Sequence, residues 1–287
     1  MKLAIASGKG GTGKTTVATS LAWVAAQTGR TVAYLDCDVD EPNGHIFLRP
    51  EIESERPIEK LVPEVDPARC THCGRCAQAC RYGAIASLPQ QTLVFAELCH
   101  ACGGCVLACP AGALREVPRP IGQLRIGRSG QIRFLEGVLQ VGEAMSPPAI
   151  RAVKSAAEAA DLTILDAPPG TSCPVVETVR GCDRVLLVTE PTPFGLYDLS
   201  LAVEMIRVLK IPFAVVINRA DAGDGRVREY CDRNRIFILA EIPDDRAVAE
   251  AYSNGQIIPQ AVPTVGKHIA DILEQLAGED GPCKNWS

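Results

Sequence analysis

The stretch Leu3-Ala4-Ile5-Ala6-Ser7-Gly8-Lys9-Gly10-Gly11-Thr12-Gly13-Lys14-Thr15 decides the fold of this chain. Its apolar start is typical of a short buried strand, and the glycines that follow are too closely spaced for a regular element. After Lys14, apolar residues recur at helical spacing until Gly29. Residues 8–15 fit G-x-x-x-x-G-K-[ST] between that strand and that helix, so we interpret them as a phosphate-binding loop. A glycine-rich turn with an incidental lysine is the alternative.

The residue types of this loop each have a physical reason. Glycines let successive backbone N–H groups turn toward phosphate oxygens, and the positive end of the following helix adds to the attraction. Lys14 is expected to reach the β- and γ-phosphates, and the Thr15 hydroxyl is expected to ligate Mg²⁺. The loop therefore predicts a magnesium-bound nucleotide as the ligand.

The rest of the chain extends the same pattern. A second apolar run, residues 32–35, stops at Asp36 and completes a strand–helix–strand unit, so its strands should be parallel. We expect further strands at 162–165, 185–188, 213–217 and 236–241, and helices at 148–160, 196–209, 245–252 and 265–276. Strands this apolar indicate a sheet covered on both faces. The predicted fold class is α/β with a mostly parallel sheet, a P-loop NTPase fold.

Of the 13 cysteines, eight lie between residues 70 and 109, in two runs 29 residues apart. The runs are Cys70, Cys73, Cys76, Cys80 and Cys99, Cys102, Cys105, Cys109. This doubled spacing is that of two-cluster bacterial ferredoxins, in which three thiolates of a run hold one cluster and the fourth reaches the other. We expect one 4Fe–4S cluster on Cys70, Cys73, Cys76 and Cys109, and a second on Cys99, Cys102, Cys105 and Cys80.

Zinc is the competing interpretation, because C-x-x-C pairs also make zinc sites. Zinc commonly takes separated pairs of ligands, whereas two complete four-cysteine runs fit two cubane clusters better. One departure from the ferredoxin pattern is that Arg81 follows Cys80, while Pro110 follows Cys109. His72 and His100 lie inside the runs, and we interpret them as neighbours of the ligands rather than as ligands.

The cysteine runs define a separate segment. Residues 63–118 begin and end with prolines, and Gly83-Ala84-Ile85 recurs as Gly112-Ala113-Leu114, so two copies of a small unit are expected there. We therefore predict an inserted α+β ferredoxin-like module at 63–118, within a nucleotide-binding domain made of 1–62 and 119–287.

Composition excludes several other classes of protein. The net charge of −5 argues against nucleic-acid binding, which needs a basic surface. No run approaches the ~20 apolar residues of a membrane helix, and the N-terminus lacks a signal-peptide pattern. We therefore expect a cytoplasmic protein that neither binds nucleic acid nor inserts into membranes.

Three motifs together resemble one known group of proteins. With its additional Lys9, the phosphate-binding loop resembles the deviant phosphate loop of the MinD, ParA and nitrogenase-iron-protein ATPases. Asp36-Cys37-Asp38 resembles the first switch region of that group, and Asp166-Ala167-Pro168-Pro169-Gly170 resembles the second. The resemblance covers both halves of the α/β domain.

The resemblance implies a homodimer that closes over two ATP molecules. In it, Lys9 would cross to the partner's phosphates and offset charge in the transition state, as an arginine finger does. Asp38 would orient the attacking water and take part in the magnesium site with Thr15, and Asp40 could share its role. Asp166 would sense or help to hold Mg²⁺. Capping of strand ends is the alternative role for Asp38 and Asp166.

The resemblance also implies the residues that contact ATP. Asn218, after a strand, would bond the adenine edge, and Pro243-Asp244 resembles the loop on the adenine side; an ordinary turn is the alternative for Asn218. The complete set of implied contacts is Gly8, Gly10, Gly11, Thr12, Gly13, Lys14, Thr15, Thr16, Asn218, Arg219, Pro243 and Asp244.

Two functions remain open at this point. One is an ATP-gated electron carrier that serves a redox partner, and the other is an ATPase scaffold that assembles a metal cluster on a client protein. Cys173 lies where the nitrogenase iron protein has one of two cysteines that bridge its dimer, but the second is absent here. A subunit-bridging cluster would have only two thiolates, so the electron route would be the insert. The other single cysteines, Cys37, Cys182, Cys231 and Cys283, are expected mostly to be small buried residues.

Two further expectations concern the insert and the segment after it. Because the insert begins soon after Asp38, we hypothesise that the nucleotide state moves the cluster module relative to the dimer. Four arginines with no acidic residue between them, Arg119, Arg125, Arg128 and Arg133, are expected to form a solvated hairpin. A docking face for an acidic redox partner is the alternative.

Overall fold

The computed structural model describes residues 1–277, and its centre is a nine-stranded sheet. The strand order is β11-β10-β9-β1-β8-β2-β7-β6-β3. Seven strands, from β11 to β7, run parallel, and the last two pairs are antiparallel. The parallel strands are β1 (Lys2–Ala6), β2 (Val32–Asp36), β7 (Ile132–Leu139), β8 (Leu162–Asp166), β9 (Arg184–Thr189), β10 (Phe213–Asn218) and β11 (Ile238–Ile242). The predicted fold class is confirmed.

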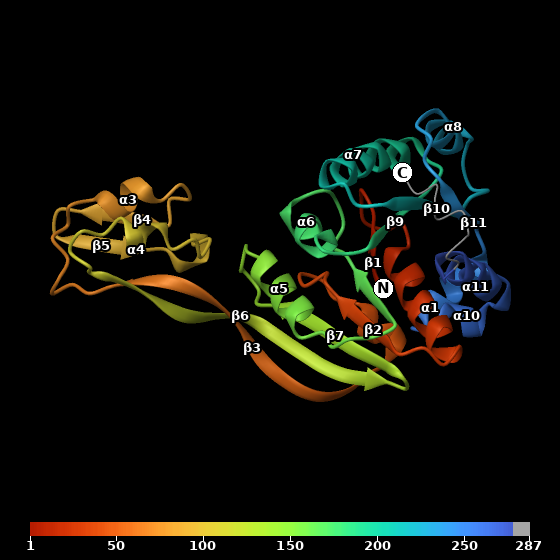
Figure 1. Cartoon of the computed structure of the whole chain (residues 1–287), viewed down its shortest axis with the longest axis horizontal. Helices are drawn as coiled ribbons and strands as arrows, with labels where there is room; N and C mark the ends of the chain where they lie inside the picture. The colour runs from red at the N-terminus through yellow and green to blue at the C-terminus, as the bar shows by residue number, and fades with distance from the viewer. Residues whose placement is uncertain (278–287) are drawn as a thin grey trace.

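Helices cover both faces of this sheet (Figure 1). One face packs against α1 (Lys14–Gln27), α9 (Arg246–Ser253), α10 (Ile258–Ala261) and α11 (Pro263–Ala277). The other packs against α5 (Pro147–Ser155), α6 (Cys173–Val179), α7 (Pro193–Leu209) and α8 (Arg226–Arg233). Alternate residues of β1 enter the two cores, because Leu3 and Ile5 pack on the α1 side and Ala4 and Ala6 on the α7 side. Both faces of β1 are therefore apolar.

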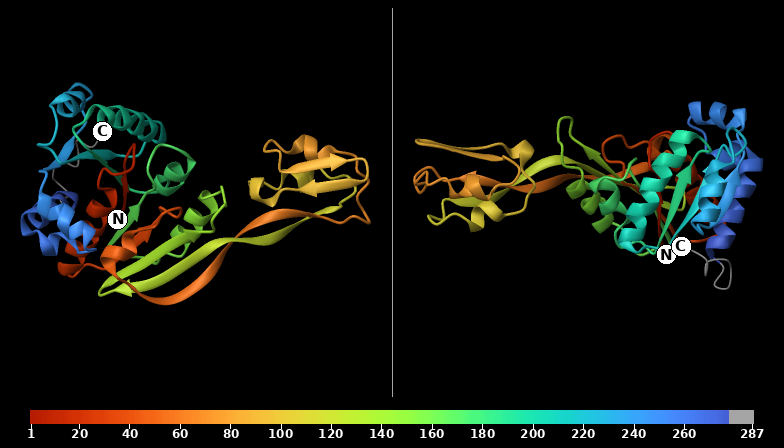
Figure 2. Two further views of the ribbon diagram at one scale, coloured as in Figure 1. Left: turned by 180° about the vertical axis from the view of Figure 1, so that it is seen from behind. Right: turned by 90° about the horizontal axis from the view of Figure 1, so that it is seen from above.

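Strands β3 (Glu51–Val65) and β6 (Leu114–Ser129) form a long antiparallel ribbon. Near its base β6 also pairs with β7, so the ribbon is a continuation of the central sheet. Figure 1 and Figure 2 show it twisting away from the ATPase-like core to a small separate lobe. The lobe contains α3 (Arg75–Ala79), β4 (Ile85–Leu88), β5 (Gln91–Val94), a 3₁₀ turn η1 (Ala96–Leu98) and α4 (Gly104–Leu107).

Sequence analysis did not predict this ribbon. The segment 51–65 is dominated by charged residues and two prolines, and its apolar residues do not form a continuous run. Proline is tolerated because β3 is the outer strand of the sheet, where one side needs no ladder hydrogen bonds. The expected boundaries at residues 63 and 118 consequently lie within β3 and β6 rather than between elements.

The short helices α2 (Gly44–Leu48), α6 and α8 were also not predicted. The helix expected at residues 148–160 corresponds to α5, which begins one residue earlier than expected and ends at Ser155. Across residues 1–277, no helix has the length and apolar character required to traverse a bilayer.

Candidate functional site

The loop between β1 and α1 adopts the backbone that its glycines predict. Gly11 and Gly13 have φ of 79° and 92°, in the left-handed region that favours glycine. A Cβ added to Gly13 would lie 2.4 Å from Nδ2 of Asn218. Asn218 approaches this closely because its Nδ2 donates a hydrogen bond to the Thr12 carbonyl at 2.9 Å. The loop is therefore fastened to the end of β10.

A cleft of about 470 Å³ opens beside this loop. This volume lies within the range of roughly 300–1,000 Å³ found for small-molecule sites. It is lined by eleven of the residues predicted for nucleotide and magnesium: Gly10, Gly11, Gly13, Lys14, Thr15, Thr16, Asp38, Asn218, Arg219, Pro243 and Asp244. Gly8, Lys9, Thr12 and Asp166 do not line it. The topology thus brings most of the predicted set, from four separate segments, to one cleft at the carboxyl ends of the strands.

Sequence analysis missed several residues of this cleft. Glu41 and Asn43 lie on the segment after β2, and Tyr252, Val265 and Ile269 come from the C-terminal helices. Tyr252, Val265 and Ile269 fall within predicted helices. Their spacing does not show whether such a residue lines a cleft or packs in the core. Their position opposite the phosphate loop makes that end of the cleft apolar, which suits an aromatic base.

Two buried carboxylates lie side by side below the loop. Asp36 and Asp166 are register partners at the ends of β2 and β8, and both are almost completely buried. The Tyr34 hydroxyl donates to Oδ2 of Asp166 at 2.9 Å, whereas the buried Oδ1 of Asp166 has no hydrogen-bond partner. Burial raises the pKa of Asp166, and the Lys14 ammonium opposes that rise. An unpartnered buried carboxylate oxygen beside Lys14 fits a site completed by a cation or its water.

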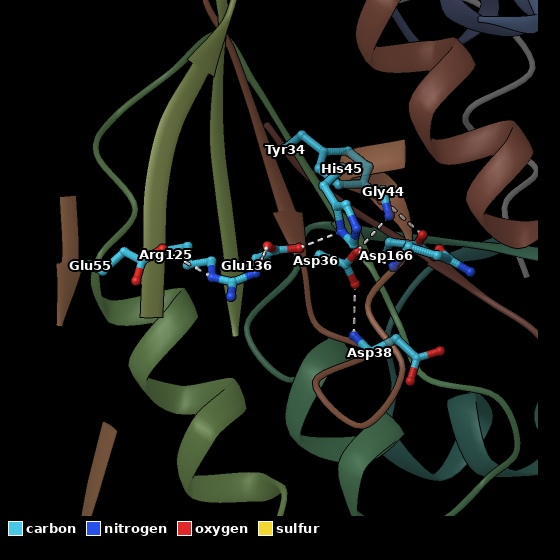
Figure 3. A network of polar contacts seen from close by, with 10 residues as sticks. Tyr34, Asp36, Asp38, Gly44, His45, Glu55, Arg125, Glu136 and Asp166 are labelled. Atoms are coloured by element: carbon cyan, nitrogen blue, oxygen red, sulfur yellow. Dashed lines mark hydrogen bonds and ion pairs between the residues drawn. The ribbon is translucent and has the colours of Figure 1, made fainter. Parts of the chain in front are cut away.

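Asp36 organises the segment that carries Asp38. Its Oδ1 accepts the Asp38 N–H at 3.1 Å, and its Oδ2 accepts the N–H groups of Asn43 and Gly44 at 3.2 and 2.9 Å (Figure 3). The Asp38 side chain is thereby left to face the cleft. Burial, and then the charge of Asp166, raises the pKa of Asp38 to about 7 despite the nearby Lys14. Asp40 does not line the cleft, and burial raises its pKa although a hydrogen bond with Ser146 opposes that rise.

Lys9 points across the loop toward the end of β9. Its Nζ lies 3.6 Å from Oε2 of Glu190, and Nη1 of Arg219 donates to the other oxygen of Glu190 at 2.7 Å. The Lys9 side chain is 30% exposed. Gly8, the residue before it, packs so closely on α7 that an added Cβ would lie 2.1 Å from the Asp198 carbonyl oxygen. Lys9 is therefore held at the surface near the loop and outside the cleft of its own chain.

The small lobe contains two cavities lined by cysteines. The first cavity is lined by Cys70, Cys73, Cys76 and Cys109. The second cavity is lined by Cys80, Cys99, Cys102 and Cys105. Each cavity thus takes three cysteines from one run and one from the other, the grouping that was expected from spacing alone. None of these thiols forms a disulfide.

The donor set of each cavity fits an iron–sulfur cluster. Four thiols line a space backed by apolar residues, among them Ala113 and Leu114 in the first cavity and Ala84 and Ile85 in the second. In the part of the chain that the structure describes, no three His, Cys, Asp or Glu side chains are arranged to hold a single metal ion. Four thiolates spread around a cavity suit a multi-iron cluster better than one tetrahedral zinc ion.

The single cysteines lie away from both cavities. Cys37, Cys182 and Cys231 are buried, as expected, and burial raises the pKa of each thiol. Cys173 is exposed at the start of α6. Cys283 lies outside the described residues.

A chain of polar contacts joins the nucleotide side to the ribbon (Figure 3). His45, which follows the Gly44 held by Asp36, has its Nδ1 3.0 Å from Oε2 of the buried Glu136 on β7. Arg125 on β6 contacts Oε1 of Glu136 at 3.2 Å and Glu55 on β3 at 3.2 Å. The chain therefore crosses from α2 to both ribbon strands.

A second cluster of charges ties the lobe to the core. The ammonium of Lys60 lies 2.6 Å from Glu143, and both side chains are almost completely buried. Arg119 contacts Glu143 at 3.1 Å and Glu97 of the lobe at 3.0 Å. Because Glu143 follows β7 in the core, this cluster connects core, ribbon and lobe.

The basic segment is a hairpin of β6 and β7, as expected, but its arginines are paired with carboxylates rather than free to dock a partner. Arg119 and Arg125 are paired as described, and Arg128 and Arg133 both pair with Glu53 on β3. The acidic partners come from segments distant in sequence, so the absence of acidic residues between the arginines gave no sign of them. The four cations stabilise the ribbon internally.

Comparison with known proteins identifies the family. Residues 3–258 match the CobQ/CobB/MinD/ParA nucleotide binding domain. An uncharacterized protein of Methanocaldococcus jannaschii is 34% identical over 281 residues, which is 96% of each chain. A protein of Pyrococcus furiosus named iron-sulfur cluster carrier protein is 24% identical over 97% of this chain and 86% of its own length.

Solved structures show the same fold. The septum site-determining protein MinD of Pyrococcus horikoshii, complexed with Mg-ADP, covers 98% of each chain with a TM-score of 0.61 and 17% identity. That likeness concerns the fold alone. The match over residues 3–258, together with the geometry of the phosphate loop and its cleft, shows that this chain belongs to the CobQ/CobB/MinD/ParA family of nucleotide-binding P-loop proteins.

Proposed function

We propose that this chain is a homodimeric ATPase that couples its nucleotide state to two 4Fe–4S clusters, through which electrons pass to a partner protein. The observation that carries the proposal is the pair of four-cysteine cavities at the end of a ribbon that continues the nucleotide-binding sheet. Bound clusters would supply one-electron storage.

The nucleotide half of the proposal rests on the cleft. Lys14 and the backbone of residues 10–13 would hold the phosphates, and Thr15 with Asp38 would complete the magnesium site. Asp166 would help to hold Mg²⁺ through its Oδ1, which has no hydrogen-bond partner in the structure. Beside Mg²⁺ the Asp38 carboxylate would be ionised, because a nearby cation lowers the pKa that burial raises, and it would orient the attacking water as an acceptor.

The position of Lys9 supports the proposed dimer. Its ammonium is held at the surface outside its own cleft, a position from which it would reach the phosphates bound by a second copy. In the closed dimer Lys9 would exchange Glu190 for the partner's nucleotide and offset charge there.

The coupling between the halves would run through the switch segment. Asp36 holds the loop of Asp38 on one side and α2 on the other, and His45 of α2 contacts the ribbon through Glu136. The backbone N–H of Leu139, at the end of β7, also donates to the Val39 carbonyl at 2.8 Å. Movement of residues 38–45 on ATP binding would therefore act on the strands that carry the lobe.

A second candidate function is an ATPase carrier that delivers clusters to client proteins. It is favoured by the relatives named iron-sulfur cluster carrier protein, such as those of Pyrococcus furiosus and Pyrococcus abyssi. In that case the clusters of the lobe would leave the protein rather than cycle between redox states.

One experiment separates the candidates and tests the coupling. Protein prepared without oxygen is put through cycles of chemical reduction and reoxidation in the presence of ATP or of ADP. Loss of iron to a chelator is measured with each nucleotide. We expect repeated reduction without iron loss, and a nucleotide dependence of chelator access that Lys14→Ala abolishes. Lys2→Ala, which removes an exposed lysine at the other end of β1 from the loop, is the matched control. Transfer of iron and sulfide to an apo-ferredoxin probe would favour the carrier, and identical behaviour with ATP and ADP would refute the coupling.

A further inference from the structure

The internal repeat of the lobe is preserved in its backbone. His72 and Ala101, which are 29 positions apart, both have a left-handed φ, 54° and 53°. Gly74 and Gly103 are likewise paired, with φ of 73° and 69°. The first and second cavities can therefore be compared position by position, and each difference in side chain is a difference in the surroundings of otherwise equivalent thiols.

The first cavity offers two polar side chains to one thiol. Oγ1 of Thr92 lies 3.5 Å from Sγ of Cys70, and Nδ1 of His72 lies 3.7 Å from the same sulfur. The two side chains also approach each other at 3.4 Å. A ligating thiolate carries no proton, so the Thr92 hydroxyl would donate to it.

The second cavity lacks both groups at the equivalent positions. Ala101 stands where His72 stands in the first, and Pro63, 29 residues before Thr92, lines the second cavity. The equivalent thiol, Cys99, accepts only from the Ala101 backbone N–H among the described residues, at 3.4 Å. It therefore receives no side-chain donor.

The charges around the cavities differ in the same direction. Glu116 lines the second cavity, and its Oε1 lies 3.5 Å from the position of a Cβ on Gly103. The equivalent position beside Gly74 is Ser87, whose Cβ lies 4.0 Å away. Among residues 1–277, Glu116 has no ion-pair partner, so its negative charge is not neutralised by a neighbour.

Two arginines precede ligand cysteines of the first run in the sequence. Arg69 precedes Cys70 and Arg75 precedes Cys76, while the equivalent residues of the second run are Leu98 and Gly104. The second cavity has Arg81 directly after its ligand Cys80, and because Arg69, Arg75 and Arg81 are all exposed, solvent screens each of these charges.

Two stacked aromatic rings line the second cavity. Tyr82 and His100 stack with ring centroids 3.5 Å apart and planes 8° from parallel, and both line that cavity. Their equivalents in the first cavity are the smaller Ala111 and Thr71. Reduction adds negative charge, which hydrogen-bond donors, cations and water stabilise and a carboxylate opposes.

We propose that the first cavity holds the cluster of higher reduction potential and the second holds that of lower potential, so that electrons enter at the second and leave from the first. An external one-electron donor would be oxidised at the second cavity, and a one-electron acceptor on the partner protein would be reduced at the first. The proposal rests on the proposed function, because it requires clusters in both cavities. Thr92 and Glu116 are positioning residues for the thiolate environment and are not ligands.

The test is a redox titration followed by electron paramagnetic resonance on the full chain. Iron and sulfide are measured first. Absent clusters would refute the proposed function, and this inference with it, before any midpoint is measured. In loaded protein we expect two separate reduction midpoints. Thr92→Val should shift only the higher midpoint downward, and Glu116→Gln should shift only the lower midpoint upward. Gln91→Ala, an exposed change on the same strand as Thr92, should shift neither.

The outcomes are distinct. Loaded protein with a single midpoint that both variants leave unchanged would overturn the inference. A downward shift of the lower midpoint in Thr92→Val would reverse the assigned order and overturn it as well. Equal iron content in all variants would show that the shifts arise from surroundings and not from lost ligands.

Discussion

Replacing Asp38 with asparagine should stabilise the protein in the absence of nucleotide and magnesium. Burial and the neighbouring Asp166 raise the pKa of Asp38 from 3.8 to about 7. A carboxyl whose pKa is raised in the folded state costs stability that accumulates as pH rises from about 4 to about 7 and is fully present above that. Each unit of pKa difference corresponds to about 1.4 kcal/mol, so the stability gained by removing this carboxyl is at most about 4 kcal/mol. Because the side chain is partly solvated, we expect a gain of about 2 kcal/mol.

Thermal unfolding of Asp38→Asn and the wild type at several pH values measures this effect. A gain of about 2 kcal/mol should raise Tm by about 4–8 °C at pH 8 for a chain of this size. At pH 5.5 the gain should be about half as large, because much of the cost has then disappeared. Asp271→Asn, the same change at an exposed position on α11, should change Tm little at either pH. An Asp38→Asn protein no more stable than the wild type at pH 8 would refute the reasoning.

Three further predictions concern other parts of the structure. Gly13→Ala would force a Cβ to 2.4 Å from Asn218 at a φ of 92°, so it should cost about 1–3 kcal/mol and weaken ATP binding in calorimetry; unchanged affinity would contradict the close approach. Glu143→Gln should destabilise by about 3–5 kcal/mol in urea unfolding, because it leaves the buried Lys60 charge unpaired, and a loss under 1 kcal/mol would speak against that pair. Lys154→Met should cost about 2–3 kcal/mol, since Nζ donates to three backbone carbonyls near the end of α6, and faster hydrogen exchange there would accompany the loss.

The features that were best predicted from the sequence are those whose interacting groups lie within a few residues of one another. The phosphate loop needs its glycines because backbone groups within a few residues must converge, and that requirement is visible in residues 8–15. The grouping of cysteines into two cavities was likewise predictable, because a run as tight as Cys70 to Cys76 can direct its thiols only to one centre.

The ribbon could not be predicted because its stability is long-range. Arg125 and Glu55 pair across strands, and Glu136 joins them from a third strand more than ten residues away. Each segment alone appears as a polar stretch with the composition of a loop. The positions of Lys9 beside Glu190 and of Asp36 beneath Asp38 have the same origin, since they depend on which strands become neighbours.

The central claim is that a nucleotide-binding sheet carries two iron–sulfur clusters on its own ribbon, and metal analysis of protein prepared without oxygen tests it most directly. We expect about eight iron and eight sulfide per chain, as for two 4Fe–4S clusters. The same content should persist in Cys173→Ser, because Cys173 lines neither cavity. Colourless protein that holds zinc, or no metal, on these cysteines would contradict the claim.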